Sequence, residues 1–482
     1  MTGNAAPGKR FNSRNTSTRQ ERYAASGIAA SILVALLILI LPAPEGLSVE
    51  GQRMAALFAV ALILFVTEAI PIAVTSVLIL MLQPVMGITD NIRDAFSSWM
   101  TPVFFFVLVM FVLAQAVNAT GLARRFALWL LTLAGSDSRK IIMVFVIGAG
   151  VMSLIMSDVA ACAIFMAIGL GIIEKMNLKP GSRFAKALML GIPIGALIGG
   201  IGTPAGSSIN LLGLDQLETY GGVRVRFFDW MMIGMPMVVF LLPLASWIVS
   251  RFCSPEMVSI DKVEEIRQEH AKAGPISMPQ IKVLVILSAM VVLWILSTWY
   301  TALDIYMVGI GGAVAMFLPG IKVVKWKEVQ EGAGWDSMLL IGGVTSLGSA
   351  SVATGLAQWI VDVSLGSIAD WQAVWIIALI SAFTVVMHLI LPVNPAIVTV
   401  LIPPLTILAK HTGVNPALYA LPVAFTASCA FLLPLDAVPL LTYSKGYYKM
   451  FDMFPPGVVI SVLWIVLMAA VLTLIAPLLG YI

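Results

Sequence analysis

Two aspartates stand where long apolar stretches of the sequence are interrupted. Asp158 lies in Ser-Leu-Ile-Met-Ser-Asp-Val-Ala, within the apolar segment 141–173, and Asp436 lies in Leu-Pro-Leu-Asp-Ala-Val-Pro, within the apolar segment 416–443. A carboxylate inside a membrane costs about 2.5 to 3.5 kcal/mol on insertion scales, so a functional role is the default expectation. The chemistry that fits is cation ligation or protonation, and the alternative is a hydrogen-bonded structural aspartate.

Two more apolar segments are interrupted by small or polar residues. The segment 185–213 contains Gly-Gly-Ile-Gly-Thr-Pro-Ala-Gly-Ser-Ser-Ile-Asn from Gly199, and the segment 372–408 contains Leu-Pro-Val-Asn-Pro-Ala around Asn394. Where the backbone leaves a helix within a bilayer, its N–H and C=O groups must form hydrogen bonds with protein, water or a ligand. The N–H groups of a helix N-terminus suit a carboxylate, and unwound carbonyls with Ser, Asn and Asp oxygens suit sodium.

Basic residues are absent around these breaks. No Lys or Arg occurs in 141–174, 187–223, 371–409 or 411–444. An anion bound there would be neutralised by bound cations and helix ends. This pattern favours cation-coupled symport over simple anion binding.

The composition places these segments in a membrane. The chain has 482 residues, of which 60% are hydrophobic and 11% charged, with a mean hydropathy of +0.99, whereas a soluble domain carries roughly 25% charged residues. This excludes a cytosolic enzyme, a disordered chain and a disulfide scaffold. Cys162, Cys253 and Cys429 lack the spacing of zinc sites or disulfide frameworks and are interpreted as packing residues. We expect no organic cofactor and no nucleic-acid partner.

We predict an all-α polytopic membrane protein with about eleven spanning helices and two re-entrant hairpins, 141–174 and 372–408. With a cytoplasmic N-terminus, all but five of the 28 Lys and Arg residues fall on the inner side, as the positive-inside rule requires. The five outer ones are Arg53, Arg93, Arg224, Arg226 and Lys410. We therefore predict a multi-pass protein of the plasma (inner) membrane, surrounded by lipid.

An internal repeat divides the chain. Asn-Ala-Thr-Gly-Leu-Ala at 118–123 recurs as Val-Ala-Thr-Gly-Leu-Ala at 352–357, and each hairpin follows at a similar distance. Five spans per half invert the second copy, and inverted repeats with broken helices are typical of secondary transporters. The predicted divisions are a cytoplasmic tail 1–26, a first transmembrane helix 27–45, a first repeat 46–252, a cytoplasmic linker 253–280 and a second repeat 281–482.

The chain resembles the divalent anion/sodium symporters, the family of di- and tricarboxylate and sulfate carriers. The resemblance rests on Thr67–Pro71, Ala119–Leu122, Ile198–Pro204, and Ser428–Pro434 with Gly446-Tyr447 after it. It implies a homodimer with a scaffold and an elevator-like transport part. The expected function is sodium-coupled uptake of a small organic anion, most simply a C4 dicarboxylate.

The resemblance also implies site residues, although both hairpin tips depart from the family's Ser-Asn-Thr triplet: the first reads Ser157-Asp158-Val159 and the second Val393-Asn394-Pro395. The predicted cation-binding residues, with sodium as the metal, are Ser153, Ser157, Asp158, Gly206, Asn394 and Asp436. The predicted substrate-binding residues are Asp158, Val159, Ser207, Asn394, Pro395, Ala437 and Val438.

Several alternatives remain open at this stage. The gained aspartates leave room for proton coupling and for a less charged substrate such as a monocarboxylate or sulfonate, and an anion exchanger would have much the same sequence. An intramembrane aspartyl protease is a remote alternative because its motifs are absent, so no enzymatic activity is expected. His388 is interpreted as a packed, hydrogen-bonded histidine rather than a proton relay, and Glu68 and Asp336 as boundary residues.

Overall fold

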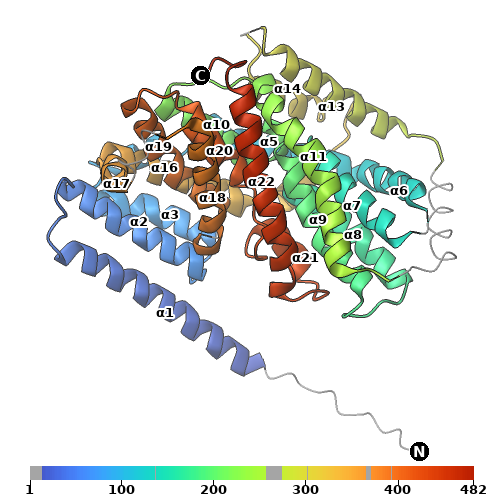
Figure 1. Ribbon diagram of the computed structural model, residues 1–482, viewed down its shortest axis with the longest axis horizontal. Helices are drawn as coiled ribbons and strands as arrows, with labels where there is room; N and C mark the ends of the chain where they lie inside the picture. Colours follow the sequence, from blue (N-terminus) through green and yellow to red (C-terminus); the bar gives the residue numbers. More distant parts are fainter. Residues whose placement is uncertain are drawn as a thin grey trace, which may run out of the picture.

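The computed structural model describes residues 13–135, 137–256, 274–300, 302–364, 371–391 and 393–481. These residues form helices and no strand, which confirms the all-α prediction (Figure 1). Part of the predicted tail and most of the predicted linker lie outside the described residues. The first helix, α1, begins at Ser13, inside the stretch that the sequence assigns to the tail.

Among the described residues, the first half of the chain contains eleven helices of the α type and ends with α11. Their bounds are α1 (Ser13–Ile40), α2 (Val49–Thr67), α3 (Ile72–Val85), α4 (Ile92–Ser97), α5 (Pro102–Ala119), α6 (Leu122–Ala134), α7 (Ser138–Ser153), α8 (Asp158–Lys175), α9 (Arg183–Gly200), α10 (Ser208–Gln216) and α11 (Phe227–Cys253). Short 3-10 and π turns, η1 (Pro204–Gly206) and η2 (Leu217–Gly221), flank α10.

The second half runs from α13 to α22 in the described residues. Its helices are α13 (Met278–Leu296), α14 (Ile305–Ala315), α15 (Trp326–Gly332), α16 (Trp335–Ala353), α17 (Leu356–Ser364), α18 (Ala373–Ile390), α19 (Asn394–His411), α20 (Ala417–Thr426), α21 (Ala437–Tyr443) and α22 (Phe454–Ile475), with a 3-10 turn η3 (Met450–Asp452).

Seven of the described helices are long and apolar enough to cross a membrane, namely α2, α5, α9, α11, α13, α18 and α22. Four shorter apolar stretches accompany them, at Ala24–Ile40, Ile72–Val85, Ile305–Ala315 and Ala417–Thr426. The chain is therefore a polytopic membrane protein, and both predicted hairpins are pairs of helices, α7 with α8 and α18 with α19.

The helices pack into two groups. We define the hairpin group as α7–α11 with α18–α22, and the flanking group as α2–α5 with α13–α16. Within the first, α9 packs on α7, α8 and α11, and α22 packs on α11 and α18; within the second, α3 packs on α16 and α5 on α14. The groups meet where α16 contacts α19 and α5 contacts α10. Helix α1 lies at the edge of the bundle, beside α2 (Figure 1).

The internal repeat is visible in local geometry. In both copies of the Ala-Thr-Gly-Leu-Ala motif the glycine has a positive φ, 69° at Gly121 and 78° at Gly355, and turns the chain from a long helix into a short one. In both copies the threonine hydroxyl donates a 2.8 Å hydrogen bond to the carbonyl four residues earlier, Thr120 to Ala116 and Thr354 to Ala350. The same sequence thus forms the same turn twice.

Glycines allow α7 and α9 to approach backbone to backbone. A methyl group on Gly195 would lie 2.2 Å from the Val146 carbonyl oxygen, and one on Gly199 would lie 2.0 Å from the Gly150 carbonyl oxygen. Small residues at a four-residue spacing are the usual means of close helix contact in membranes. This contact fixes the first arm of the first hairpin against the broken span that follows it.

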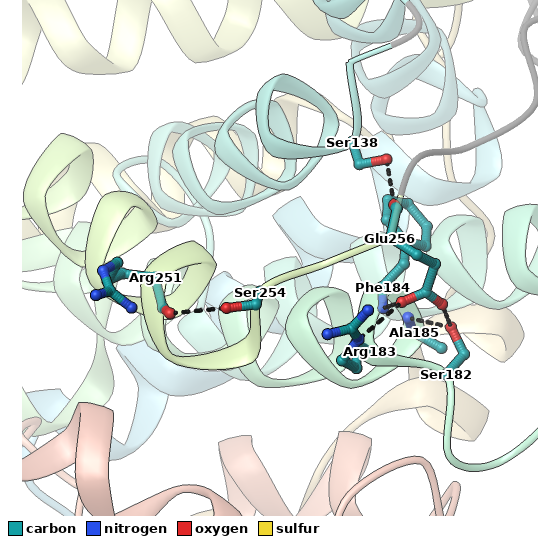
Figure 2. Close-up of polar contacts among 8 residues, drawn as sticks. All are labelled: Ser138, Ser182, Arg183, Phe184, Ala185, Arg251, Ser254 and Glu256. Carbon is teal, nitrogen blue, oxygen red and sulfur yellow. Dashed lines mark hydrogen bonds and ion pairs between the residues drawn. The ribbon is translucent and has the colours of Figure 1, made fainter.

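The start of the predicted linker is anchored on the hairpin group. The Glu256 carboxylate accepts hydrogen bonds from the Ser182 hydroxyl and from the Phe184 backbone N–H at 3.1 Å, and its backbone carbonyl accepts one from the Ser138 hydroxyl at 2.6 Å (Figure 2). Partial burial opposes ionisation, but these donors outweigh it and hold the pKa of Glu256 below its usual value. The far end of the linker is held by Arg125, which donates to the carbonyls of Gly274 and Pro275.

Candidate functional site

Four helix breaks converge on one cavity. They are the hairpin tips between α7 and α8 and between α18 and α19, and the interruptions between α9 and α10 and between α20 and α21. The cavity has a volume of about 310 Å³. All seven residues that the sequence predicts for substrate binding line it: Asp158, Val159, Ser207, Asn394, Pro395, Ala437 and Val438.

Asp158 is the first residue of α8 and is only 4% exposed. Its Oδ1 accepts hydrogen bonds from the Val159 backbone N–H at 2.8 Å and from the Ser157 hydroxyl at 3.3 Å. Its Oδ2 is buried and has no hydrogen-bond donor among the described residues, and Ser207 is a further neighbour of the carboxyl group. A buried, unpaired carboxylate oxygen is costly, which indicates that a bound species completes this site.

Oxygen atoms gather behind Asp158 around two glycines. A methyl group on Gly200 would lie 3.2 Å from the Ser153 hydroxyl oxygen, 3.4 Å from Asp158 Cβ and 3.4 Å from the Gly206 carbonyl oxygen. A methyl group on Gly206 would lie 2.3 Å from the Gly200 carbonyl oxygen and 2.6 Å from that of Ser153. The buried Ser153 hydroxyl also lacks a partner among the described residues. Carbonyl, hydroxyl and carboxylate oxygens are the donor set that sodium prefers.

Asp436 lies at the break between α20 and α21, the counterpart in the second half of the break between α9 and α10. It is the N-cap of α21, is 7% exposed, and its Oδ1 accepts a hydrogen bond from the Val438 backbone N–H at 3.1 Å. Beside it lies a cavity of about 10 Å³ that His388 also lines, enough for roughly one water-sized species. Asn394, 2% exposed, has a buried Oδ1 without a hydrogen-bond partner in the described part of the chain.

The predicted cation-binding residues divide into two sets. Asp158, Asn394 and Asp436 line the large cavity, whereas Ser153, Ser157 and Gly206 are absent from its lining. Ser153 and Gly206 surround Gly200, and Ser157 donates to Asp158. The structure thus brings the predicted substrate and cation residues to adjoining positions.

His388 is buried, and its Nε2 lies 3.2 Å from the Thr426 carbonyl oxygen. Its Nδ1 makes no hydrogen bond of good geometry with the described residues, the Asn394 side chain lies near it, and the choice between a packed histidine and a proton relay stays a prediction. Cys162, Cys253 and Cys429 are free and buried, as packing residues are.

Two acidic residues of the flanking group also line the cavity, and sequence reasoning missed this role. Glu68 follows α2 with a left-handed backbone (φ 45°), and Asp336 lies in the first turn of α16; both are exposed. The sequence interpretation treated them as boundary residues. In the sequence, neither residue has another candidate site residue beside it. Only the packing of α2 and α16 near the hairpin tips shows that Glu68 and Asp336 line the same cavity.

Side chains already cap most helix N-termini at the cavity. Asp158 accepts from the first turn of α8, Asp436 from that of α21, and the Ser207 hydroxyl from Ile209 of α10 at 3.4 Å. The N-terminus of α19 differs, because its N-cap, Val393, provides no side-chain hydrogen bond. Pro395 has no N–H, and the N–H groups of Ala396 and Ile397 donate to the Val393 carbonyl oxygen, so little of this helix end remains for a ligand anion.

Most of the chain is similar in sequence to known membrane transport proteins. Residues 24–482 match the family described as the sodium:sulfate symporter transmembrane region. The chain is 30% identical over 481 residues to the sodium-dependent dicarboxylate transporter SdcS of Staphylococcus saprophyticus, with 94% of this chain and 91% of the relative covered. It is 26% identical to SdcS of Staphylococcus aureus strain RF122, covering 93% and 89%.

The solved structure of Neisseria gonorrhoeae MtrF, described as illuminating a class of antimetabolite efflux pumps, aligns with a TM-score of 0.56 at 12% identity. The alignment covers 94% of each chain. At this identity the likeness concerns the fold alone, and it supports the all-helical architecture.

Proposed function

Because the chain belongs to the sodium:sulfate symporter family, we propose that it is a secondary active transporter that couples sodium to the uptake of a small C4 dicarboxylate. At the family level, sodium-dependent transport of a dicarboxylate is supported by the names of its relatives. The family consists of carriers rather than enzymes. The choice of substrate, the coupling and the mechanism below are proposals for this chain.

The observation that carries the proposal is a set of buried oxygens without donors around one cavity. Asp158 Oδ2, Asn394 Oδ1 and the Ser153 hydroxyl are all buried, and none makes a hydrogen bond of good geometry with the described residues, although Ser207 lies near the Asp158 carboxyl group and His388 near the Asn394 side chain. Buried polar groups in stable proteins are nearly always satisfied. Sodium ions at these oxygens would satisfy them and would supply the positive charge that an anion needs where no Lys or Arg is present.

In this mechanism each hairpin has a defined task. Ser153, Ser157, Asp158 and Gly206 hold one sodium ion, and Asn394 and Asp436 hold a second with nearby carbonyls. The bound ions neutralise the aspartates, and the substrate then binds between the tips, against Val159, Ser207, Pro395, Ala437 and Val438. Coupling follows because the anion binds well only when the cations are present.

We further propose that the hairpin group moves as an elevator against the flanking group in a homodimer, with the N-terminus in the cytoplasm of a plasma (inner) membrane. Tyr220 and Ser349 interact between the two groups. A bifunctional thiol reagent that bridges Tyr220→Cys and Ser349→Cys should block transport while sodium-dependent ligand binding persists. Transport that continues with the cross-link complete would contradict the elevator.

The test of the proposed function is uptake of radiolabelled succinate into proteoliposomes. An inward sodium gradient should drive accumulation, and replacing sodium with choline should abolish it at every pH. Vesicles loaded with and without internal substrate separate symport from exchange, because an exchanger needs internal anion. Uptake that is unchanged without sodium would refute the proposal, and a proton gradient that replaces sodium would identify proton coupling instead.

A further inference from the structure

A second large cavity lies between the two arms of the second hairpin, apart from the residues that the proposed function assigns to sodium and substrate. It has a volume of about 410 Å³. Apolar side chains line it along α18 from Ile376 to Met387 and along α19 from Val400 to Leu408. The arms of the first hairpin pack closely on each other, whereas those of the second pack less closely. The space between α18 and α19 is therefore large enough to hold a ligand.

The cavity opens toward the hydrocarbon of the membrane. Leu379 and Phe383 belong to its α18 wall and are 39% and 52% exposed, and α18 is long and apolar enough to cross a membrane. Trp371 and Trp375, at the start of α18, are also exposed, and such tryptophans are typical of the boundary between hydrocarbon and water. A molecule that enters this cavity therefore comes from the bilayer.

The length of the cavity matches one leaflet of the bilayer. Ile376 and Met387 are eleven residues apart on α18, which at 1.5 Å per residue is about 16 Å along the helix. The hydrocarbon core of a bilayer is about 30 Å thick, so the acyl chains of one leaflet fill about 15 Å of it. One acyl chain that lies along the hairpin arms would extend through the whole cavity.

One polar side chain contributes to this apolar wall. Tyr419 of α20 lines the cavity and is 1% exposed, and its buried hydroxyl makes no hydrogen bond of good geometry with the described residues. Only the loop 412–416 separates α19 from α20, so Tyr419 lies toward the end of the hairpin arms that is remote from the tip. A buried hydroxyl without a partner is costly. A ligand that carries a hydrogen-bond acceptor at this end of the cavity would satisfy it.

We propose that this cavity binds a phospholipid, with one acyl chain between α18 and α19 and the ester carbonyl of that chain accepting a hydrogen bond from the Tyr419 hydroxyl. The ester is the acceptor that a phospholipid places at the head of its acyl chain, where the hydrocarbon ends. The bound chain fills the space between the arms and holds them at their observed spacing. This lipid site goes beyond the proposed function and does not depend on which anion is carried.

The test is photo-crosslinking of the full chain in nanodiscs of phosphatidylcholine, a fraction of which carries a diazirine at the end of one acyl chain. Lipid at the outer surface labels exposed residues such as Val386, whereas a chain inside the cavity labels buried wall residues. We expect mass spectrometry to find label on Leu401, and on Leu408 when the diazirine is placed beside the ester instead. Label confined to exposed residues would overturn the proposal.

A variant that fills the cavity separates this site from general lipid contact. Ile380→Phe places a larger side chain in the cavity wall and should lower the labelling of Leu401 at least fivefold. Val386→Phe is the matched control, because it enlarges a side chain of the same helix that is 50% exposed and lies outside the cavity lining. It should leave the labelling unchanged. Cooperative thermal unfolding shows that each variant is folded, and equal labelling in the two variants would refute the lipid site.

Tyr419→Phe tests the hydrogen bond to the ester. In detergent solution, it should raise the phosphatidylcholine concentration that gives half-maximal thermal stabilisation by about threefold to tenfold. Without lipid, the variant should be at least as stable as the wild type, since it removes an unpaired buried hydroxyl. A lipid midpoint equal to that of the wild type would contradict the proposal.

A second copy of the chain is the competing occupant of this face of α18. In that case Phe383→Cys, on the exposed part of the wall, should form a disulfide between two chains, and Leu401 should carry no label. That pair of results would assign the face to a protein interface and would overturn the lipid site. Label on Leu401 without a disulfide between chains supports it.

Discussion

Replacing Gly199 of α9 with alanine tests how the first hairpin is held at the cation site. The added methyl would lie 2.0 Å from the Gly150 carbonyl oxygen of α7 and 2.4 Å from the Gly150 carbonyl carbon. Both contacts are with backbone, so no side-chain rotation can relieve them. The helices must therefore separate.

The size of the separation follows from the contact distance. Ordinary contact begins at about 3.4 Å, so α7 must move by roughly 1.4 Å relative to α9. Overpacking of this kind costs about 1 to 3 kcal/mol. Ser153 ends α7, one turn after Gly150, and would move away from Gly200 and Gly206. Cation ligands must keep their distances within about 0.2 Å, so sodium affinity should fall about 10- to 100-fold, as it does when supporting residues of a metal site are lost.

The assay is thermal unfolding of the purified protein over a sodium titration, because a ligand that binds only the folded state stabilises it by RT ln(1 + [L]/Kd). Gly171→Ala in α8 is the matched control, since a methyl there meets nothing within 4 Å. It should leave sodium affinity unchanged and raise stability by about 0.5 to 1 kcal/mol through helix propensity. If Gly199→Ala matches the control in both stability and sodium affinity, the packing account of the site is wrong.

Three further predictions concern single residues. Asp158→Asn should weaken sodium binding at least tenfold without lowering the protein level, and unchanged sodium and pH dependence of transport would contradict a role in coupling. Glu256→Gln should lower stability by up to about 1 kcal/mol at neutral pH, measured against wild type by thermal unfolding. Because the pKa of Glu256 is lowered by folding, this contribution is present above its usual value of 4.5 and is lost as the pH falls through the lower pKa of the folded protein. If Glu256→Gln remained less stable than the wild type in acid, the ionised Glu256 carboxylate would not be the source of the stability difference. Gly121→Ala and Gly355→Ala should each cost roughly 1 kcal/mol because both backbones are left-handed, and clearly unequal unfolding temperatures would argue against equivalent turns.

Much of the fold could be predicted because its signals are local. Apolar length predicts the spanning helices, and the interruptions at Ser157-Asp158 and at Asn394 predict where the hairpins turn. The structure places helix breaks there, with α8 beginning at Asp158 and α19 at Asn394. Helix α1 begins at Ser13, within the predicted tail, because a polar stretch such as 13–26 can be helical when an apolar helix continues it.

The set of acidic side chains that line the cavity could not be predicted, since it depends on tertiary packing. Glu68 and Asp336 are isolated acids in the sequence, and only the convergence of α2 and α16 on the hairpin tips places them in one wall with Asp158 and Asp436. The sequence also predicts helix N-termini open to an anion. In the structure two of these ends are capped by the aspartates themselves, which depends on side-chain conformation rather than on residue order.

The central claim is that sodium and the substrate bind together at the cavity between the hairpin tips. The most direct test is the dissociation constant of succinate, measured by titration calorimetry at low and at saturating sodium. We predict at least a tenfold gain in affinity with sodium, and loss of that gain in Asp158→Asn. An affinity that does not depend on sodium in the unmodified protein would contradict the account.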